Sequence, residues 1–148
     1  MKKMFFVMLC LVCFIATGCG GSKLKEGTYE GSALDNYGGQ ENTATAKVVV
    51  DANGKITSVY LDTTYTSDGQ KTTKKTLGDA YGMYNHPYGS KIGEWDDQVE
   101  KLEQAIVKHQ GTDFLALGED GKTDAVSGCT IAIDALIRAY ENAINKAK

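Results

Sequence analysis

The octet Thr123-Asp124-Ala125-Val126-Ser127-Gly128-Cys129-Thr130 is the stretch from which the rest of the chain can be interpreted. It combines an acid, a flexible Ser-Gly turn, a small thiol side chain and a threonine. A long amphipathic pattern follows at once. This order predicts that Thr130 lies at or near the start of a helix.

Thr130 and Gly128 have the properties of a phosphate-binding turn. Threonine is a favoured N-cap residue, and glycine lets the backbone approach a ligand closely. The free N–H groups and the dipole at a helix start attract phosphate. The octet therefore suggests a phosphate-bearing ligand, although a bare S-G-x-T pattern is more often a plain turn capped by its threonine.

Residues Asp124 to Thr130 resemble the D-x-x-(S/T)-G-A-T signature of the FMN-binding domain family, which includes the NqrC and RnfG redox subunits and flavin-carrying surface lipoproteins. In that family the final threonine hydroxyl receives FMN through a phosphoester bond made by a separate flavin transferase. The resemblance makes Thr130 the acceptor and Asp124 the leading acid. It makes Ser127 and Gly128 the turn. Cys129 stands where alanine is usual, which is a small change in volume.

Residues 1–18 have the pattern of a targeting segment. A basic start precedes the apolar run Met4 to Ile15, which is too short to span about 30 Å of hydrocarbon as a helix. The sequence Ala16-Thr17-Gly18-Cys19 resembles a bacterial lipobox. We therefore predict a lipoprotein signal peptide over 1–18 and a lipidated tether over 19–26. The alternative is an ordinary secretory signal in which the cysteine is incidental.

The predicted signal peptide accounts for three of the four cysteines. Cys10 and Cys13 lie inside the removed apolar run, and Cys19 carries the lipid. Cys129 is then the one free thiol of the mature chain. The expected location is the extracytoplasmic face of a bacterial membrane, with the lipid on Cys19 as the anchor.

The mature chain has the size and charge of one acidic domain. Removing residues 1–18 from the 148 leaves 130, and we assign residues 27–148 to one FMN-binding domain. Because the leader carries two lysines and no acid, the net charge changes from −3 to −5 on its removal. Scattered basic residues on an acidic chain argue against nucleic acid as a partner. His86 and His109 lack the spacing with cysteine that a metal site needs, so no metal is expected.

Alternating apolar residues predict strands in the first half of the domain. We expect a strand over 26–33, a turn over 36–39 and a hairpin whose strands cover 43–50 and 55–65. The turn over 51–54 carries a strong Asn-Gly signal. A G-x-Y-x-G start followed by such a hairpin also resembles the beginning of FMN-binding domains.

Apolar residues at helical spacing predict two helices in the second half, over 94–109 and 131–146. The apolar segment 114–117 between them is a strand or a turn. Strands first and helices later favour an α+β fold, with an antiparallel sheet covered by two main helices. The family resemblance implies a twisted, half-barrel-like sheet with flanking helices.

The segment 67–93 lacks periodicity and gathers aromatic and thioether side chains, which can sandwich a flat ring such as isoalloxazine. A satellite core under a long loop explains this composition equally well. Tyr81-Gly82-Met83, followed by Lys91 to Gln98, resembles a Y-G-M…K-E-W…Q segment of lipoprotein members of the family. The resemblance favours the flavin, so Tyr81, Gly82 and Met83 join Asp124, Ser127, Gly128, Cys129 and Thr130 as expected cofactor-binding residues.

Two functions fit these observations. In the first, the protein is a membrane-anchored flavoprotein that carries FMN, covalently at Thr130, and acts as an extracytoplasmic electron carrier. Its partners are then a flavin transferase and redox proteins. In the second, a surface lipoprotein of the same fold binds a ligand or partner without redox turnover. We find no catalytic triad, paired-carboxylate signature or nicotinamide fingerprint that would indicate an enzyme with its own substrate. The first function is favoured because the acid, the turn and the threonine occur together.

Overall fold

The computed structural model of the protein describes residues 23–84 and 86–148. The signal peptide predicted over 1–18 and the Cys19 anchor lie outside the described residues. Within the described part, none of the helices has the length and apolar character needed to cross a bilayer.

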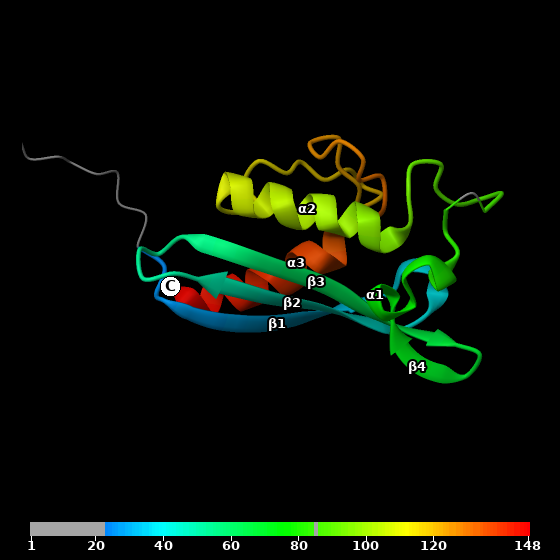
Figure 1. Cartoon of the computed structure of the whole chain (residues 1–148), viewed down its shortest axis with the longest axis horizontal. Coiled ribbons are helices and arrows are strands. Elements are labelled where there is room, and N and C mark those ends of the chain that lie inside the picture. Colours follow the sequence, from blue (N-terminus) through cyan, green and yellow to red (C-terminus); the bar gives the residue numbers. More distant parts are fainter. Residues whose placement is uncertain (1–22, 85) are drawn as a thin grey trace, which may run out of the picture.

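Four antiparallel strands form an open sheet in the order β1-β2-β3-β4 (Figure 1). The strands are β1 (Gly27–Asp35), β2 (Asn42–Val50), β3 (Ile56–Ser67) and β4 (Gln70–Thr73). The turn between β2 and β3 places Gly54 at a φ of 77°, as the Asn-Gly signal predicts. The three strands expected from the sequence are confirmed. The fourth was missed, because β4 is short and entirely polar in sequence.

Side chains from β2 and β3 form the buried face of the sheet. On β2, buried residues alternate with exposed ones, and the buried set is Ala44, Ala46, Val48 and Val50. On β3, Ile56, Val59 and Leu61 are buried on the same core. Each buried valine, isoleucine or leucine stabilises the fold by about 1.5–3 kcal/mol relative to its exposed state.

Two long helices cover this face and run along the strands (Figure 1). Helix α2 (Trp95–His109) packs on β3, and α3 (Asp134–Ile144) packs on β1 and β2. The predicted apolar stripes are buried in both helices: Trp95, Val99, Leu102 and Ile106 in the first, and Ile137, Tyr140 and Ile144 in the second. The α+β fold with an antiparallel sheet and flanking helices is therefore confirmed.

Short elements connect these layers. The turn after β1 is the 3-10 helix η1 (Tyr37–Gly39), and β4 runs into α1 (Lys74–Leu77) and the 3-10 helix η2 (Gly78–Tyr81). The 3-10 helix η3 (Asn145–Ala147) ends the chain beside its described beginning, where the Lys25 N–H donates to the Ala147 carbonyl at 2.7 Å. The last residues of the predicted tether thus contact the domain.

The start of the last helix differs from the prediction. Helix α3 begins at Asp134 rather than at residue 131, and Ile133 occupies the N-cap position without a side-chain cap. The Ile133 N–H donates to the carbonyl of Gly121 at 2.8 Å, which ties this part of the chain to the preceding loop. Thr130 therefore does not cap α3, and the capping role predicted for it is wrong.

Candidate functional site

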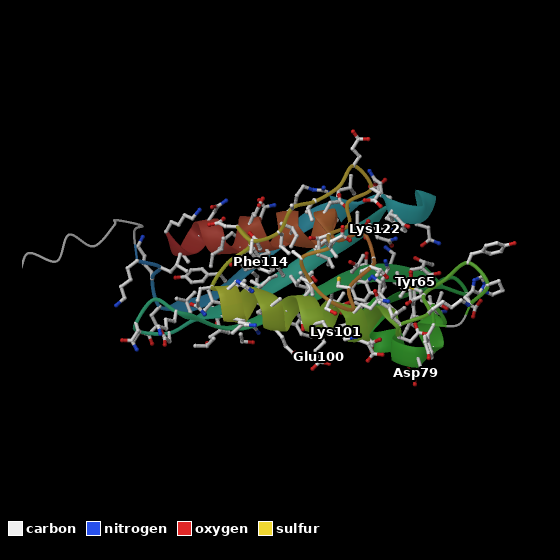
Figure 2. The ribbon with its side chains drawn as sticks, turned by 90° about the horizontal axis from the view of Figure 1, so that it is seen from above. Tyr65, Asp79, Glu100, Lys101, Phe114 and Lys122 are labelled. Carbon is white, nitrogen blue, oxygen red and sulfur yellow. The ribbon has the colours of Figure 1, made fainter. Side chains whose placement is uncertain are left out.

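A cavity of about 380 Å³ opens where the end of β1, the middle of β3, α1 and the start of α3 meet. Two irregular segments complete its wall: one precedes α2 and contributes Met83, Tyr88, Gly89 and Ser90, and the other precedes α3 and contributes Lys122 and residues 130–132. Figure 2 shows Lys122 on this second loop and Lys101 on the neighbouring helix α2. The volume lies within the range of about 300–1,000 Å³ that small-molecule and cofactor sites occupy.

Thr130 lies in the cavity wall with an exposed side chain. Its backbone N–H donates to Oε1 of Gln98 at 2.9 Å, and its hydroxyl donates to the same oxygen at 3.2 Å. One amide oxygen thus holds both polar groups of this threonine. Since the hydroxyl proton is engaged by Gln98, the lone pairs of Oγ1 are left for contacts within the cavity.

Gln98, on the buried side of α2, anchors this arrangement. The side chain is fully buried, and its Nε2 donates to the hydroxyl of Ser90 at 2.8 Å and to the carbonyl of Gly93 at 3.0 Å. The orientation of the amide is determined, because the Gly93 carbonyl can only accept and the Thr130 N–H can only donate. Gln98 therefore joins the loop before α2 to the loop before α3.

The other octet residues shape the turn that presents Thr130. The Cys129 N–H donates to the Val126 carbonyl at 3.1 Å, and Gly128 has a φ of 81°, which glycine adopts without strain. Asp124 and Ser127 are exposed, and among the octet residues the cavity wall includes Thr130 alone. Cofactor contacts by Asp124, Ser127, Gly128 and Cys129 stay predictions.

The Cys129 side chain is buried at the core beneath this turn. Burial raises the pKa of the Cys129 thiol, because a thiolate loses hydration there. The thiol is therefore a small packing group rather than a nucleophile. This agrees with its position in the signature where the family usually has alanine.

The aromatic segment is divided between the cavity and the solvent. Tyr81 and Met83 line the cavity, with Gly82 between them at a φ of 74°. Burial raises the pKa of Tyr81 to about 12, and its ring meets that of Tyr65 edge-on at 5.1 Å. Tyr88 borders the cavity but is 96% exposed, so it lies at the mouth. Two further members of the cluster, Tyr84 and His86, are exposed and outside the described wall.

A buried carboxylate holds the aromatic segment in place. Glu94 accepts hydrogen bonds from the backbone N–H groups of Met83 at 2.9 Å and Tyr84 at 2.6 Å. Charge-assisted bonds of this kind are shorter and about twice as strong as neutral ones. Glu94 therefore sets the position of Met83 in the cavity wall.

Sequence reasoning missed several polar residues of the wall, among them Asp35, Thr63 and Lys74. Lys74 is buried, and its ammonium lies 5.0 Å from the Trp95 ring centroid and 5.4 Å from that of Tyr81. Burial lowers the pKa of Lys74, while the carboxylates of Asp35 and Asp62 act in the opposite direction. Thr63 carried a signal, because it is a polar residue at an inward position of the alternating pattern of β3. We find no sequence signal for Lys74.

Comparisons with known proteins identify one family and one similar solved structure. A family profile described as the FMN-binding domain matches residues 38–145. The chain is also similar to a protein from Clostridium thermocellum whose solution NMR structure was determined as a structural-genomics target. The two are 33% identical, the similarity covers 84% of this chain and 93% of that chain, and the TM-score is 0.56. No functionally curated protein matches.

Proposed function

The chain belongs to the FMN-binding domain family, which makes FMN its cofactor, and on this premise we propose that it carries the FMN covalently on Thr130. We further propose that the protein is anchored outside the cytoplasm through Cys19 and exchanges electrons with redox proteins. The observation that carries the proposal is the exposed Thr130 hydroxyl, held by a buried amide at the wall of a cofactor-sized cavity.

The polar character of the cavity fits FMN. The buried hydroxyl of Thr63 has no hydrogen-bond partner among the described residues, and it faces a cavity in which a heteroaromatic ring can supply one. Tyr81, Met83 and Trp95 offer apolar surface to a flat ring. Lys122, in the same wall as Thr130, offers a cation to a phosphate, although its ammonium also lies 3.9 Å from the Asp120 carboxylate. When bound, FMN supplies the electron chemistry.

Covalent attachment requires a phosphoester bond between Thr130 Oγ1 and the phosphorus of the flavin nucleotide. The hydroxyl loses its proton, and the donor loses a leaving group from phosphorus. We assign the donor to a flavin nucleotide with a phosphoanhydride bond, which breaks and releases a nucleoside monophosphate. Gln98 orients the hydroxyl, but an amide oxygen is too weak a base to remove its proton. The base is therefore assigned to the flavin transferase.

Visible spectroscopy and intact mass spectrometry test this proposal. The chain is produced with and without a flavin transferase, denatured and filtered to remove free flavin. We expect a yellow band and a mass increase of one FMN less one water in the first sample alone. A colourless, unmodified chain would support the second candidate function, a lipoprotein that binds a ligand or partner without covalent flavin.

Membrane anchoring is tested separately through Cys19. We expect Cys19→Ala to move the processed chain from the membrane fraction to the soluble fraction, because the lipid is the proposed anchor. Retention of the unlipidated chain in the membrane fraction would contradict the proposed anchor. It would leave the flavin proposal intact.

A further inference from the structure

Two polar side chains in the wall of the same cavity have no hydrogen-bond partner among the described residues. The Thr63 hydroxyl, on β3, is 1% exposed as a residue and has no hydrogen-bond partner among the described residues. The Lys74 ammonium, on α1, forms neither a salt bridge nor a hydrogen bond within residues 23–84 and 86–148. A buried hydroxyl without a partner costs free energy, and together with a cation in the same cavity wall it points to a ligand.

The adjacent lysine, Lys75, differs from Lys74 because its ammonium has a charged partner. Lys75 forms a salt bridge with Glu103 and lies over the ring of Tyr60 at 4.1 Å, away from the cavity. The ammonium of Lys74 lies over the rings of Trp95 and Tyr81 instead. These rings favour a cation but accept no conventional hydrogen bond. The three N–H donors of Lys74 are therefore available to a ligand.

The carboxylates of Asp35 and Asp62, which act electrostatically on Lys74, accept hydrogen bonds from other residues. Asp62 accepts the backbone N–H groups of Thr63 at 2.8 Å and Lys75 at 3.1 Å. Asp35 accepts the backbone N–H of Tyr37 at 3.0 Å. Both stabilise the positive charge of Lys74 through space without pairing with it. The lysine thus presents a partly compensated cation to the cavity.

We propose that Lys74 and Thr63 hold the acceptor-rich pyrimidine edge of the FMN ring, and that the Lys74 charge raises the reduction potential of the bound flavin. The ring nitrogen and carbonyl oxygens of this edge are acceptors, and the two side chains supply donors. A cation beside this edge favours the electron-rich state of the ring over the oxidised one. The inference rests on FMN being the cofactor, and its choice of the ring over the phosphate rests on the proposed attachment at Thr130.

An alternative use of Lys74 is to bind the phosphate of FMN. The position of Thr130 opposes this alternative, because the proposed phosphoester places the phosphate at that threonine, where Lys122 borders the cavity. Thr63 gives a second argument against phosphate binding by Lys74. The Thr63 hydroxyl and the Lys74 ammonium are two donors on neighbouring elements, and the ring edge offers several acceptors side by side.

Titration of two flavins separates the ring from the phosphate. Riboflavin has the same ring as FMN and lacks the phosphate. The protein is produced without a flavin transferase, freed of flavin and titrated with each ligand by fluorescence. We expect Lys74→Met to weaken both affinities by the same factor of about tenfold or more, as loss of a charge-assisted hydrogen bond does. Thr63→Val should weaken both by a smaller factor.

The control is Lys71→Met, which removes the same charge from an exposed position on β4 outside the cavity wall. It should leave both affinities unchanged. In protein loaded with FMN, Lys74→Met should also lower the reduction potential, and Lys71→Met should not. Circular dichroism checks folding, and Lys74→Gln, which keeps N–H donors without the charge, replaces Lys74→Met if that variant is unfolded.

Three results would overturn the inference. Loss of FMN affinity with unchanged riboflavin affinity would make Lys74 a phosphate ligand, and unchanged affinities for both would remove it from the site. Wild-type protein that binds neither flavin would exclude the ring site altogether. Protein that binds both flavins as expected but is never modified by the transferase would contradict the proposed covalent attachment alone.

Discussion

The two loops that complete the cavity are held in different ways. The loop over 118–133 is closed by its own backbone: Gly118 donates to Lys122 at 2.9 Å, Gly121 to Gly118 at 3.0 Å and Ile133 to Gly121 at 2.8 Å. The loop over 82–93 also has backbone bonds, from Gly89 to His86 and from Ser90 to Met83, both at 3.0 Å. In addition, the carboxylate of Glu94, the residue before α2, accepts hydrogen bonds from two of the loop's backbone N–H groups. This loop also exposes Tyr84, Tyr88 and Ile92.

This difference indicates that the two loops have different roles in the site. The proposed attachment point, Thr130, belongs to the loop that buries Thr123, Val126 and Cys129. The aromatic residues Tyr84 and Tyr88 belong to the loop with more exposed side chains, and segments of this kind open with lower free energy. Gln98 contacts both loops, accepting from the first and donating to the second. The comparison therefore predicts that this amide matters most, and that the Glu94 carboxylate and the turn glycines matter less.

The largest effect is expected for Gln98→Leu. This change leaves the Gly93 carbonyl and the Thr130 N–H without partners, and each lost partner costs about 1–3 kcal/mol. We expect unfolding in urea to show a loss of about 2–5 kcal/mol, together with poor flavin attachment. The matched control is Gln104→Leu on the exposed face of the same helix, where a change within about 0.5 kcal/mol is expected. Equal losses in both variants would remove Gln98 as the link between the loops.

A smaller loss of stability, confined to the loop over 82–93, is expected for Glu94→Gln. The neutral amide keeps one acceptor oxygen for the N–H groups of Met83 and Tyr84, so about 1–2 kcal/mol should be lost. Hydrogen exchange should accelerate at these two amides and stay unchanged in residues 118–133. The exposed Glu100→Gln serves as the control. Faster exchange in both loops would show that they are not held independently.

Effects no larger than that of Glu94→Gln are expected from one glycine in each loop. Gly128 (φ 81°) and Gly82 (φ 74°) adopt backbone conformations that cost an alanine about 1–2 kcal/mol. A Cβ on Gly128 would also meet the flexible end of Lys101 at 2.8 Å, whereas the nearest atom to one on Gly82 is 4.0 Å away. Thermal unfolding should therefore give similar losses for both alanine variants, with Gly128→Ala slightly the larger. A loss near zero in either variant would show that its loop relaxes.

Much of the fold could be predicted from the sequence because its signals are local. Alternation along β2 and β3, the Asn-Gly turn and the helical spacing of Trp95 to Ile106 each follow from neighbouring residues. The family resemblance inferred from the octet is confirmed by the profile match. The start of α3 was placed too early, because the apolar residues 131–133 continue the helical pattern while their backbone does not.

The site could be predicted only in part, since its wall is assembled from distant segments. Thr130, Tyr81 and Met83 were expected and line the cavity. Gln98 appeared only within a family pattern, and its role depends on contact with loops 8 and 32 residues away along the chain. Lys74 and Thr63 come from different elements, and their shared environment is a product of tertiary packing.

The central claim is that the hydroxyl of Thr130 is the attachment point, and intact mass spectrometry of three variants tests it most directly. Each is produced with a flavin transferase. Thr130→Ala should fold, losing only the hydroxyl bond to Gln98, worth about 0.5–1.5 kcal/mol, and should carry no FMN. Thr130→Ser should be modified at least in part, and Ser127→Ala, the neighbouring hydroxyl variant, should be modified fully. An FMN adduct that persists in Thr130→Ala and disappears in Ser127→Ala would contradict the claim.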